Sequence, residues 1–281
     1  MEHTNKIGTC YLVGTPIGNL KDITLRALET LRSVDVIAAE DTRHTGVLLN
    51  HYEINKPLIS CHEHNERAAT LKIKDFLNSG KSVAIVSDAG MPGISDPGAY
   101  VARTLRNDGY LLTVIPGPSA LTSAVSLVGL VDGAFLFLGF LPEKLQHKKT
   151  MLSPVKDLPW PVVFYSAPHN IVKDILFLYN TLGDRKVYVI KELTKVFETV
   201  YEGTLSNVNI ENTKGEFVLI IEPPLKSTIS DELILDEISL LLNNKITTKS
   251  AVEQVATKYS ISKNSVYSLY LKNSCIKSPI S

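Results

Sequence analysis

Short β-branched segments alternate with segments of helical periodicity over the first 115 residues, and no other feature restricts the fold as strongly. Apolar residues recur at helical spacing in the intervening segments, for example at Leu25 and Leu28. This alternation is typical of parallel strands joined by crossover helices. Asp22 is expected to cap the first helix, and Asp96 followed by Pro97 fits the start of another. The predicted strands are Cys10–Val13, Val36–Ala39, Leu58–Ser60, Val83–Val86 and Leu112–Ile115.

The segment 115–119 contains two prolines and one glycine, and it is the best position for a junction between domains. A second α/β set follows, with a helix expected near 171–182, and it ends at the two prolines 223–224. A chain of 281 residues exceeds the usual size of one domain. We therefore predict an N-terminal α/β domain over 1–117, a C-terminal α/β domain over 118–225 and a helical tail over 226–281. The strands predicted in the second domain are Phe135–Leu138, Val162–Tyr165, Val187–Lys191 and Phe217–Ile221.

The tail is expected to form three helices over 231–272, and the last two have helix-turn-helix spacing. Small Ala256 could lie where these helices cross, while Ser260 and Ile261 would form the turn. Ser262 would cap the last helix. The residues of that helix expected to face inward are Val266 and Leu269.

Positive charge is concentrated in this tail, although the net charge of the whole chain is zero. From residue 244 to the end, six lysines oppose one acid, Glu253, which gives a local charge of +5. Both interpretations of the tail therefore stay open: a nucleic-acid contact, or an appendage that only packs.

Cysteine usage and hydropathy indicate a soluble cytoplasmic protein. The three cysteines are widely spaced, with no C-x-x-C pair, so neither a disulfide framework nor a zinc site is expected. No apolar run approaches the roughly 18 residues needed to cross a bilayer. The first nine residues show no pattern of a secretory signal.

Four segments rich in glycine, proline and polar residues each follow a predicted strand. In open parallel sheets, ligands bind beyond the carboxyl ends of the strands. The first segment, 15–20, lies where nucleotide-binding proteins carry a glycine-rich phosphate loop. Three residues separate Gly14 from Gly18, Pro16 between them has no N–H to donate, and no Gly-Lys pair follows. These features exclude the nucleotide-binding loops of ordinary dehydrogenases and of P-loop proteins. The interpretation of this segment as a simple turn stays open.

The second segment, 39–44, contains two adjacent acids followed by threonine and arginine. Asp41 or Thr42 could cap the next helix. Arg43 could pair with a carboxylate or a phosphate.

The third segment, 60–66, carries two histidines in alternate positions. His62 and His64 would point the same way from an extended segment, but no further His or Cys cluster completes a coordination set, so no metal is expected. Asn65 is expected to cap the helix that follows. Histidine or glutamate here could handle a substrate, because imidazole suits proton transfer near neutral pH.

The fourth segment, 87–98, is the most constrained. The eleven residues from Asp88 to Gly98 include three glycines, two prolines and two aspartates. Glycine permits close approach of the backbone to a ligand, and Asp88 could accept hydrogen bonds from ribose hydroxyls.

In this order, these segments resemble the ribosomal RNA small subunit (16S) 2'-O-ribose methyltransferases within the tetrapyrrole (corrin/porphyrin) methylase family. The likeness runs from about residue 11 to residue 221. The family typically reads Glu-Ser-Pro-His-Arg where this chain has Ser166-Ala-Pro-His-Asn170, so the role of that loop is open. The matching segments are Thr15–Leu28, Ala39–Arg43, His62–Glu66, Ser87–Gly98, Ile115–Ala120 and Gly139–Pro142.

The resemblance implies a two-domain fold of mixed sheets flanked by helices, a homodimer, and S-adenosyl-L-methionine held in a cleft between the domains. It implies transfer of a methyl group to a decoding-centre cytidine of 16S rRNA, cytidine 1402 in rRNA numbering. The cofactor-binding residues implied are Ser87, Asp88, Ala89, Gly90, Met91, Ser119, Ala120, Gly139 and Phe140. The implied RNA-facing residues are Thr15, Pro16, Asn19, Asp41, Arg43, His62 and Asn65. The unranked candidates for the general base are Glu40, Glu63 and His64.

Two other functions stay open. A small-molecule methyltransferase acting on a porphyrin-like ring is compatible with the wider fold, and a helix-turn-helix DNA-binding regulator is compatible with the tail. Basic clusters at 43–44 and 144–149 favour an anionic polymer, whose binding would weaken steeply with salt. The regulator leaves the first 220 residues without a role.

Overall fold

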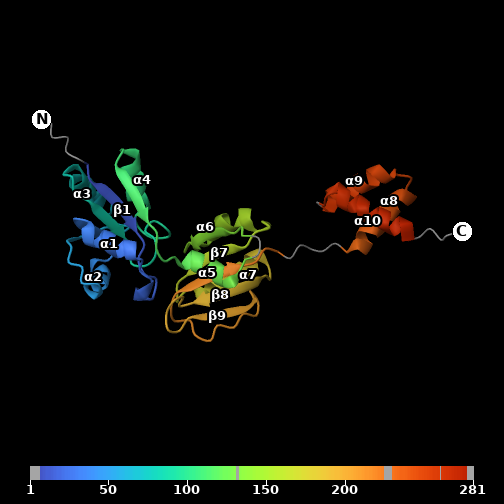
Figure 1. The fold of residues 1–281 in the computed structure, drawn as a ribbon. Helices are drawn as coiled ribbons and strands as arrows, with labels where there is room; N and C mark the ends of the chain where they lie inside the picture. Colours follow the sequence, from blue (N-terminus) through green and yellow to red (C-terminus); the bar gives the residue numbers. More distant parts are fainter. Residues whose placement is uncertain (1–6, 131–132, 225–229, 260, 277–281) are drawn as a thin grey trace. The chain divides into compact units, whose positions relative to one another are not determined.

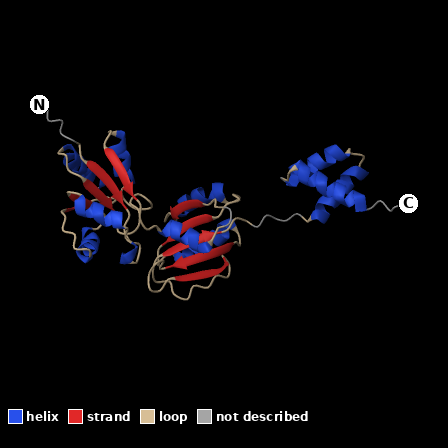
Figure 2. Ribbon diagram, viewed as in Figure 1, coloured by secondary structure: helices blue, strands red, loops and turns tan. Residues whose placement is uncertain are grey.

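The computed structural model describes residues 7–130, 133–224, 230–259 and 261–276. The chain divides into two compact units, 1–224 and 225–281. The first unit contains two five-stranded sheets, and the second contains three helices (Figures 1 and 2). No helix in these described ranges is long and apolar enough to span a membrane.

The first sheet is entirely parallel, as the alternation of strands and helices predicted, with strand order β3-β2-β4-β1-β5. All four residues of β4 are buried because helices cover both faces of the sheet. Ala84 and Val86 pack toward α1 and α2, whereas Val83 and Ile85 pack toward α3 and α4. The strands are β1 (Thr9–Val13), β2 (Val36–Ala39), β3 (Leu58–Ser60), β4 (Val83–Val86) and β5 (Leu111–Ile115).

Two of the helix caps predicted in this half of the unit are wrong. Thr24, rather than Asp22, caps the first helix by accepting a hydrogen bond from the Ala27 N–H, while Asp22 lies in the preceding short 3-10 turn Leu20–Asp22. The start at Asp96 is also wrong, because α4 begins at residue 99 after Gly98 in the left-handed region (φ 118°). The helices are α1 (Leu25–Ser33), α2 (Thr42–His51), α3 (Glu66–Asn78) and α4 (Ala99–Asn107).

The second sheet is mixed, with strand order β6-β7-β10-β8-β9. Only the β6–β7 pair is parallel. The central strand β10 is fully buried, and its residues alternate between a core beneath α6 and α7 and a core beneath α5. The strands are β6 (Leu136–Phe140), β7 (Val162–Ser166), β8 (Lys186–Lys191), β9 (Thr199–Thr204) and β10 (Phe217–Ile221). The helices are α5 (Ala120–Val128), α6 (Leu145–Leu152) and α7 (Ile171–Leu182), with a 3-10 turn at Ser153–Val155.

Two glycine backbones touch where β1 and β5 end, next to the Pro-Gly-Pro segment. A Cβ on Gly14 would lie 2.8 Å from the Gly117 Cα, and one on Gly117 would lie 2.9 Å from the Gly14 Cα. Such distances leave no room for a side chain at either position. The close contact holds the chain that leaves the first sheet against the first loop.

The tail forms three helices, α8 (Asp231–Asn243), α9 (Thr248–Tyr259) and α10 (Lys263–Ile276), as predicted. Ala256 and Val266 are buried in its small core, and Leu269 packs against it. Ser262 Oγ accepts a hydrogen bond from the Ser265 N–H, as expected of a cap. The expected turn residue Ser260 lies outside the described residues.

Candidate active site

The first and fourth candidate loops join beyond the carboxyl ends of β1 and β4. The Thr15 N–H donates to the Gly90 carbonyl at 2.9 Å, and the Gly90 N–H donates to the Thr15 carbonyl at 3.1 Å. The Thr15 hydroxyl donates to the Ser87 carbonyl at 3.1 Å. The sequence placed both loops at strand ends, and these bonds make them one rigid rim.

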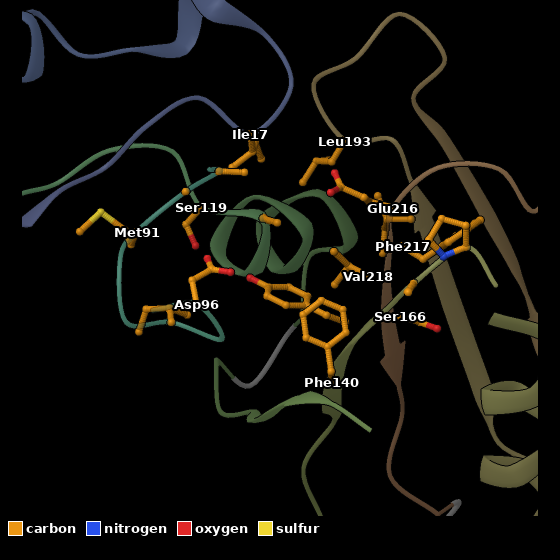
Figure 3. Close-up of a pocket in the computed structure, with 18 residues that line it drawn as sticks. Ile17, Met91, Asp96, Ser119, Phe140, Ser166, Leu193, Glu216, Phe217 and Val218 are labelled. Carbon is orange, nitrogen blue, oxygen red and sulfur yellow. The ribbon is translucent and has the colours of Figure 1, made fainter. Parts of the chain in front are cut away.

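This rim forms one wall of a cavity of about 230 Å³. A single water needs roughly 10–15 Å³ on the same measure, so the cavity admits a ligand of many atoms. Figure 3 shows Ile17 and Met91 on one side of the cavity and Phe217 and Val218, from the second sheet, on the other. The described lining residues are Ile17, Ala89, Gly90, Met91, Ile94, Asp96, Ser119, Ala120, Phe140, Tyr165, Ser166, Ala167, Pro168, Ile190, Leu193, Glu216, Phe217 and Val218.

The lining is mainly apolar and contains an aromatic pair. The rings of Phe140 and Tyr165 meet edge to face, with centroids 5.5 Å apart. The Tyr165 hydroxyl accepts a hydrogen bond from the Leu121 N–H at 3.1 Å, which ties β7 to the start of α5. Burial raises the pKa of the Tyr165 phenol. Few polar groups in a largely apolar concave surface are typical of small-molecule and cofactor sites.

Asp96 is the carboxylic acid on the side of the cavity formed by the fourth loop. Because α4 starts three residues later, Asp96 caps no helix and lines the cavity. Burial raises its pKa to about 7, and the negative charges of Glu40, Asp88 and Glu216 add to this effect.

Three further acids follow β2 and β4 at the same edge of the first sheet. The Asp88 N–H donates to Glu40 Oε2 at 3.3 Å, and the Asp41 N–H donates to Asp88 Oδ1 at 3.1 Å. Burial raises the pKa of Glu40, and the charges of Asp88 and Asp41 act in the same direction. These bonds fix the backbone that follows β2 against the backbone that follows β4.

Most residues that the resemblance implied for the cofactor line this cavity: Ala89, Gly90, Met91, Ser119, Ala120 and Phe140. Three others lie behind its surface. The buried Ser87 hydroxyl donates to the Ala89 carbonyl at 3.3 Å, and Asp88 makes the backbone bonds described above. A Cβ on Gly139 would lie 3.0 Å from the Ser95 hydroxyl, so this glycine allows β6 to approach the fourth loop.

The residues implied to face RNA are distributed around the same edge without lining the cavity. Thr15 and Pro16 are buried, whereas Asn19 is exposed and accepts a hydrogen bond from the Lys21 N–H. Asp41 caps α2 through the Arg43 N–H at 2.8 Å. The exposed Arg43 guanidinium pairs with the Asp41 carboxylate at 2.7 Å, which lowers the pKa of that carboxyl.

The third loop is closed by Asn65, which stands at the N-cap position of α3 without capping it. Its side chain instead accepts from the His62 N–H at 2.8 Å and donates to the Ser60 carbonyl at 3.2 Å. Glu63 and His64 are exposed and also lie outside the cavity lining. Within the described ranges, no three His, Cys, Asp or Glu residues are grouped to hold a metal ion.

Sequence reasoning missed most of the cavity wall that the second sheet contributes. It also missed Asp96, because the pair Asp96-Pro97 is typical of a helix start. The available signal was the segment 166–170, which begins at the last residue of β7 and departs from the pattern of the family. The missed lining residues are Ile17, Ile94, Asp96, Tyr165, Ser166, Ala167, Pro168, Ile190, Leu193, Glu216, Phe217 and Val218.

A buried polar chain supports the cavity from behind β7. The Ser166 hydroxyl donates to Asp174 Oδ2 at 2.8 Å, and Lys148 Nζ donates to Asp174 Oδ1 at 2.9 Å. The Asp174 side chain is 5% exposed and that of Lys148 is 15% exposed. Lys148 therefore belongs to the interior of the second half and contributes little to the basic surface expected at 144–149.

Comparison with known proteins agrees with this architecture. Residues 9–209 match the model of the family described as Tetrapyrrole (Corrin/Porphyrin) Methylases. The chain is 39% identical to ribosomal RNA small subunit methyltransferase I of Bacillus subtilis (strain 168), covering 94% of both chains. It is also 39% identical to the protein of the same name from Escherichia coli O157:H7, covering 95% of this chain and 96% of the relative.

Two solved structures share the fold of the first unit at low sequence identity. A diphthine synthase superposes with a TM-score of 0.61 at 16% identity, over 76% of this chain and 89% of that one. Uroporphyrin-III-C-methyltransferase from Thermus thermophilus superposes with a TM-score of 0.56 at 21% identity, over 76% and 94%. The order of the strands, the cavity between the two sheets and the match over residues 9–209 lead to one conclusion: the chain belongs to the tetrapyrrole (corrin/porphyrin) methylase family and is a methyltransferase.

Proposed function

We propose that this chain transfers a methyl group from S-adenosyl-L-methionine to the ribose 2'-hydroxyl of a decoding-centre cytidine in 16S rRNA, cytidine 1402 in rRNA numbering. The observation that carries the proposal is the likeness, over 94% of both chains, to a protein named ribosomal RNA small subunit methyltransferase I. The small ribosomal subunit is thus the proposed partner, and a homodimer is the proposed assembly.

The residues of the cavity fit this cofactor. Phe140 and Tyr165 line the cavity and offer ring surfaces to a nucleoside base. Asp96 supplies a negative charge within an apolar wall, which suits a cationic ligand. When bound, the cofactor supplies a methyl group on a positively charged sulfur.

The chain's contribution to the reaction is chiefly alignment. A rim fixed by backbone bonds between Thr15 and Gly90 can hold donor and acceptor at the ~3–3.5 Å separation that favours an in-line displacement. The apolar walls exclude water from the reacting groups.

The ribose hydroxyl must also lose its proton, and we propose Glu40 as the base. Burial raises the pKa of Glu40 toward neutral pH, where a general base is most effective. Its Oε2 is held by the Asp88 N–H at the same edge of the sheet as the cavity rim. Glu63 and His64 are exposed on the third loop and serve as comparison positions.

The decisive experiment incubates the protein with tritiated S-adenosyl-L-methionine and small ribosomal subunits from a strain lacking this gene. We expect label on one ribose of 16S rRNA, and a kcat lower by roughly 10²–10⁴-fold in Glu40→Gln with cofactor affinity unchanged. Label on a base, or no label on RNA while a porphyrin-like ring is methylated, would overturn the proposal. Unchanged kcat in Glu40→Gln with loss in His64→Ala would reassign the base alone.

A further inference from the structure

The cavity has acidic side chains but no basic one among the described residues that line it. Its two acids are Asp96 and Glu216. Glu216 has a cationic partner, because its Oε2 lies 3.0 Å from Lys195 Nζ, although this lysine also pairs with Glu192 at 2.9 Å. Within the described part of the chain, no basic group lies within 4 Å of the Asp96 carboxylate.

The surroundings of Asp96 increase this imbalance. The titratable groups nearest to it are Glu40 after β2, Asp88 after β4, Glu216 before β10 and the Tyr165 phenol on β7. Figure 3 shows the Asp96 carboxylate turned into the cavity beside Ser119, with Glu216 across from it. An ionised carboxylate that has lost much of its water and lacks a partner is unfavourable. A ligand that brings a positive charge to this carboxylate removes the free-energy cost of leaving it without a partner.

We propose that Asp96 is the residue that makes the cavity prefer the sulfonium form of the cofactor over the neutral thioether left after methyl transfer. The inference rests on the proposed function, since it assumes that the cavity takes S-adenosyl-L-methionine. The two ligands differ by one methyl group and one positive charge at sulfur. An apolar pocket distinguishes poorly between ligands that differ by one methyl group, so the charge must provide most of the preference.

The number of protons released on binding provides a second measurement of the role of Asp96, separate from the binding affinity. With a pKa of about 7, Asp96 is partly protonated in the free protein at neutral pH. A bound cation stabilises the ionised form, so binding of the sulfonium releases a proton from Asp96, whereas binding of the thioether releases none from it. Each unit by which the cation lowers the pKa corresponds to tenfold tighter binding by the ionised pocket.

The test is calorimetry on the full chain with three probes: S-adenosyl-L-methionine, its thioether product, and sinefungin, which carries an amine in place of the sulfonium. The variants are Asp96→Asn and, as a matched loss of one charge outside the cavity, Glu29→Gln on the exposed face of α1. The preference is the ratio of the Kd of the thioether to the Kd of a cationic ligand. We expect Asp96→Asn to decrease this ratio at least about tenfold for both cationic ligands, with the Kd of the thioether unchanged. Glu29→Gln should keep the wild-type preference.

Proton release is measured at pH 7 in two buffers of different ionisation enthalpy. The amino group of the ligand also titrates near this pH, but equally for both proteins, so the difference between wild type and Asp96→Asn reports Asp96. An unchanged preference in Asp96→Asn, or equal proton release by the two proteins, would overturn the inference and leave the proposed function intact. Failure of the wild type to bind any of the three probes would instead contradict the proposed function.

Discussion

Lys148→Met should destabilise the first unit, because Lys148 is the ion-pair partner of the buried Asp174 carboxylate. Among the described residues, Asp174 has no other ion-pair partner. Asp174 is buried, and its carboxylate accepts from Lys148 Nζ at 2.9 Å and from the Ser166 hydroxyl at 2.8 Å. Methionine has an unbranched stem of similar length, but it lacks the ammonium group that pairs with Asp174 and that lies 5.3 Å from the centre of the Phe177 ring. The variant therefore removes the contacts of the ammonium group while it keeps a side chain of similar length.

The magnitude follows from the burial of the pair. Removing one partner of a buried ion pair typically costs about 3–5 kcal/mol. Because the Lys148 side chain keeps 15% of its surface exposed, water can replace part of the lost interaction, so we expect the low end, about 3 kcal/mol. For a unit of 224 residues, roughly 2–4 °C of Tm per kcal/mol gives a decrease of about 6–12 °C.

Thermal unfolding followed by circular dichroism measures this decrease, and a double variant supplies the control. Lys148→Met with Asp174→Leu removes both charges, and it should recover much of the lost Tm because no charge remains buried without a partner. The Ser166 hydroxyl then loses its acceptor, so recovery should be incomplete. A Tm within 2 °C of wild type for Lys148→Met alone would refute the reasoning.

Three further predictions concern other parts of the first unit. Gly14→Ala places a methyl group 2.8 Å from the Gly117 Cα, so we expect a loss of about 1–3 kcal/mol in urea unfolding and weaker cofactor binding; unchanged stability would contradict the close contact. Cys10 is fully buried and its pKa is raised to about 12, mainly by burial, so iodoacetamide at pH 8 should leave it unmodified in the folded protein; rapid native alkylation, found by mass spectrometry, would argue against this packing. The Asp35 carboxylate accepts from the Ser82 N–H at 2.7 Å, and this bond lowers the pKa of Asp35 in the folded protein. The carboxylate therefore stabilises the fold above the unfolded pKa of about 3.9, and this stabilisation is lost as the pH falls through the lower folded pKa. Asp35→Ala should therefore be less stable than wild type at pH 7, and the difference should shrink as the pH falls below about 4. A difference that does not change with pH would be evidence against this origin.

The first sheet was predictable because both of its faces are buried. Strands such as Val36–Ala39 and Val83–Val86 are short, apolar and bounded by polar residues, and the structure gives the same bounds. Strand β9 (Thr199–Thr204) was missed. It is an edge strand in which no residue is fully buried, and the sequence Thr-Val-Tyr-Glu-Gly-Thr shows no alternation of apolar and polar residues, because the apolar Val200 is at an exposed position.

The candidate site was predictable only on the side formed by the first sheet. Loops rich in glycine and proline after β1 and β4 mark a site by composition alone. The opposite wall is formed by Phe217 and Val218, which have the same apolar character as any buried strand. Their role depends on which face of the second sheet meets the first, and this is a tertiary relation that local periodicity does not encode.

Asp96 shows how a strong local signal can mislead. Aspartate followed by proline favours a helix start, but Gly98 at φ 118° delays α4 to residue 99 and frees the carboxylate. The Gly98 N–H donates to Glu66 at 2.6 Å, so the turn is fixed by α3, an element distant in sequence.

The cavity between the loops of the first sheet and the start of β10 is the proposed binding site of the methyl donor. A crystal structure of the full chain grown with S-adenosyl-L-methionine would locate the donor. We expect the donor to lie between residues 89–91 and Phe217, with its sulfur facing Asp96. Density for the donor at any other place, or a cavity that stays empty at saturating donor concentration, would contradict this binding site.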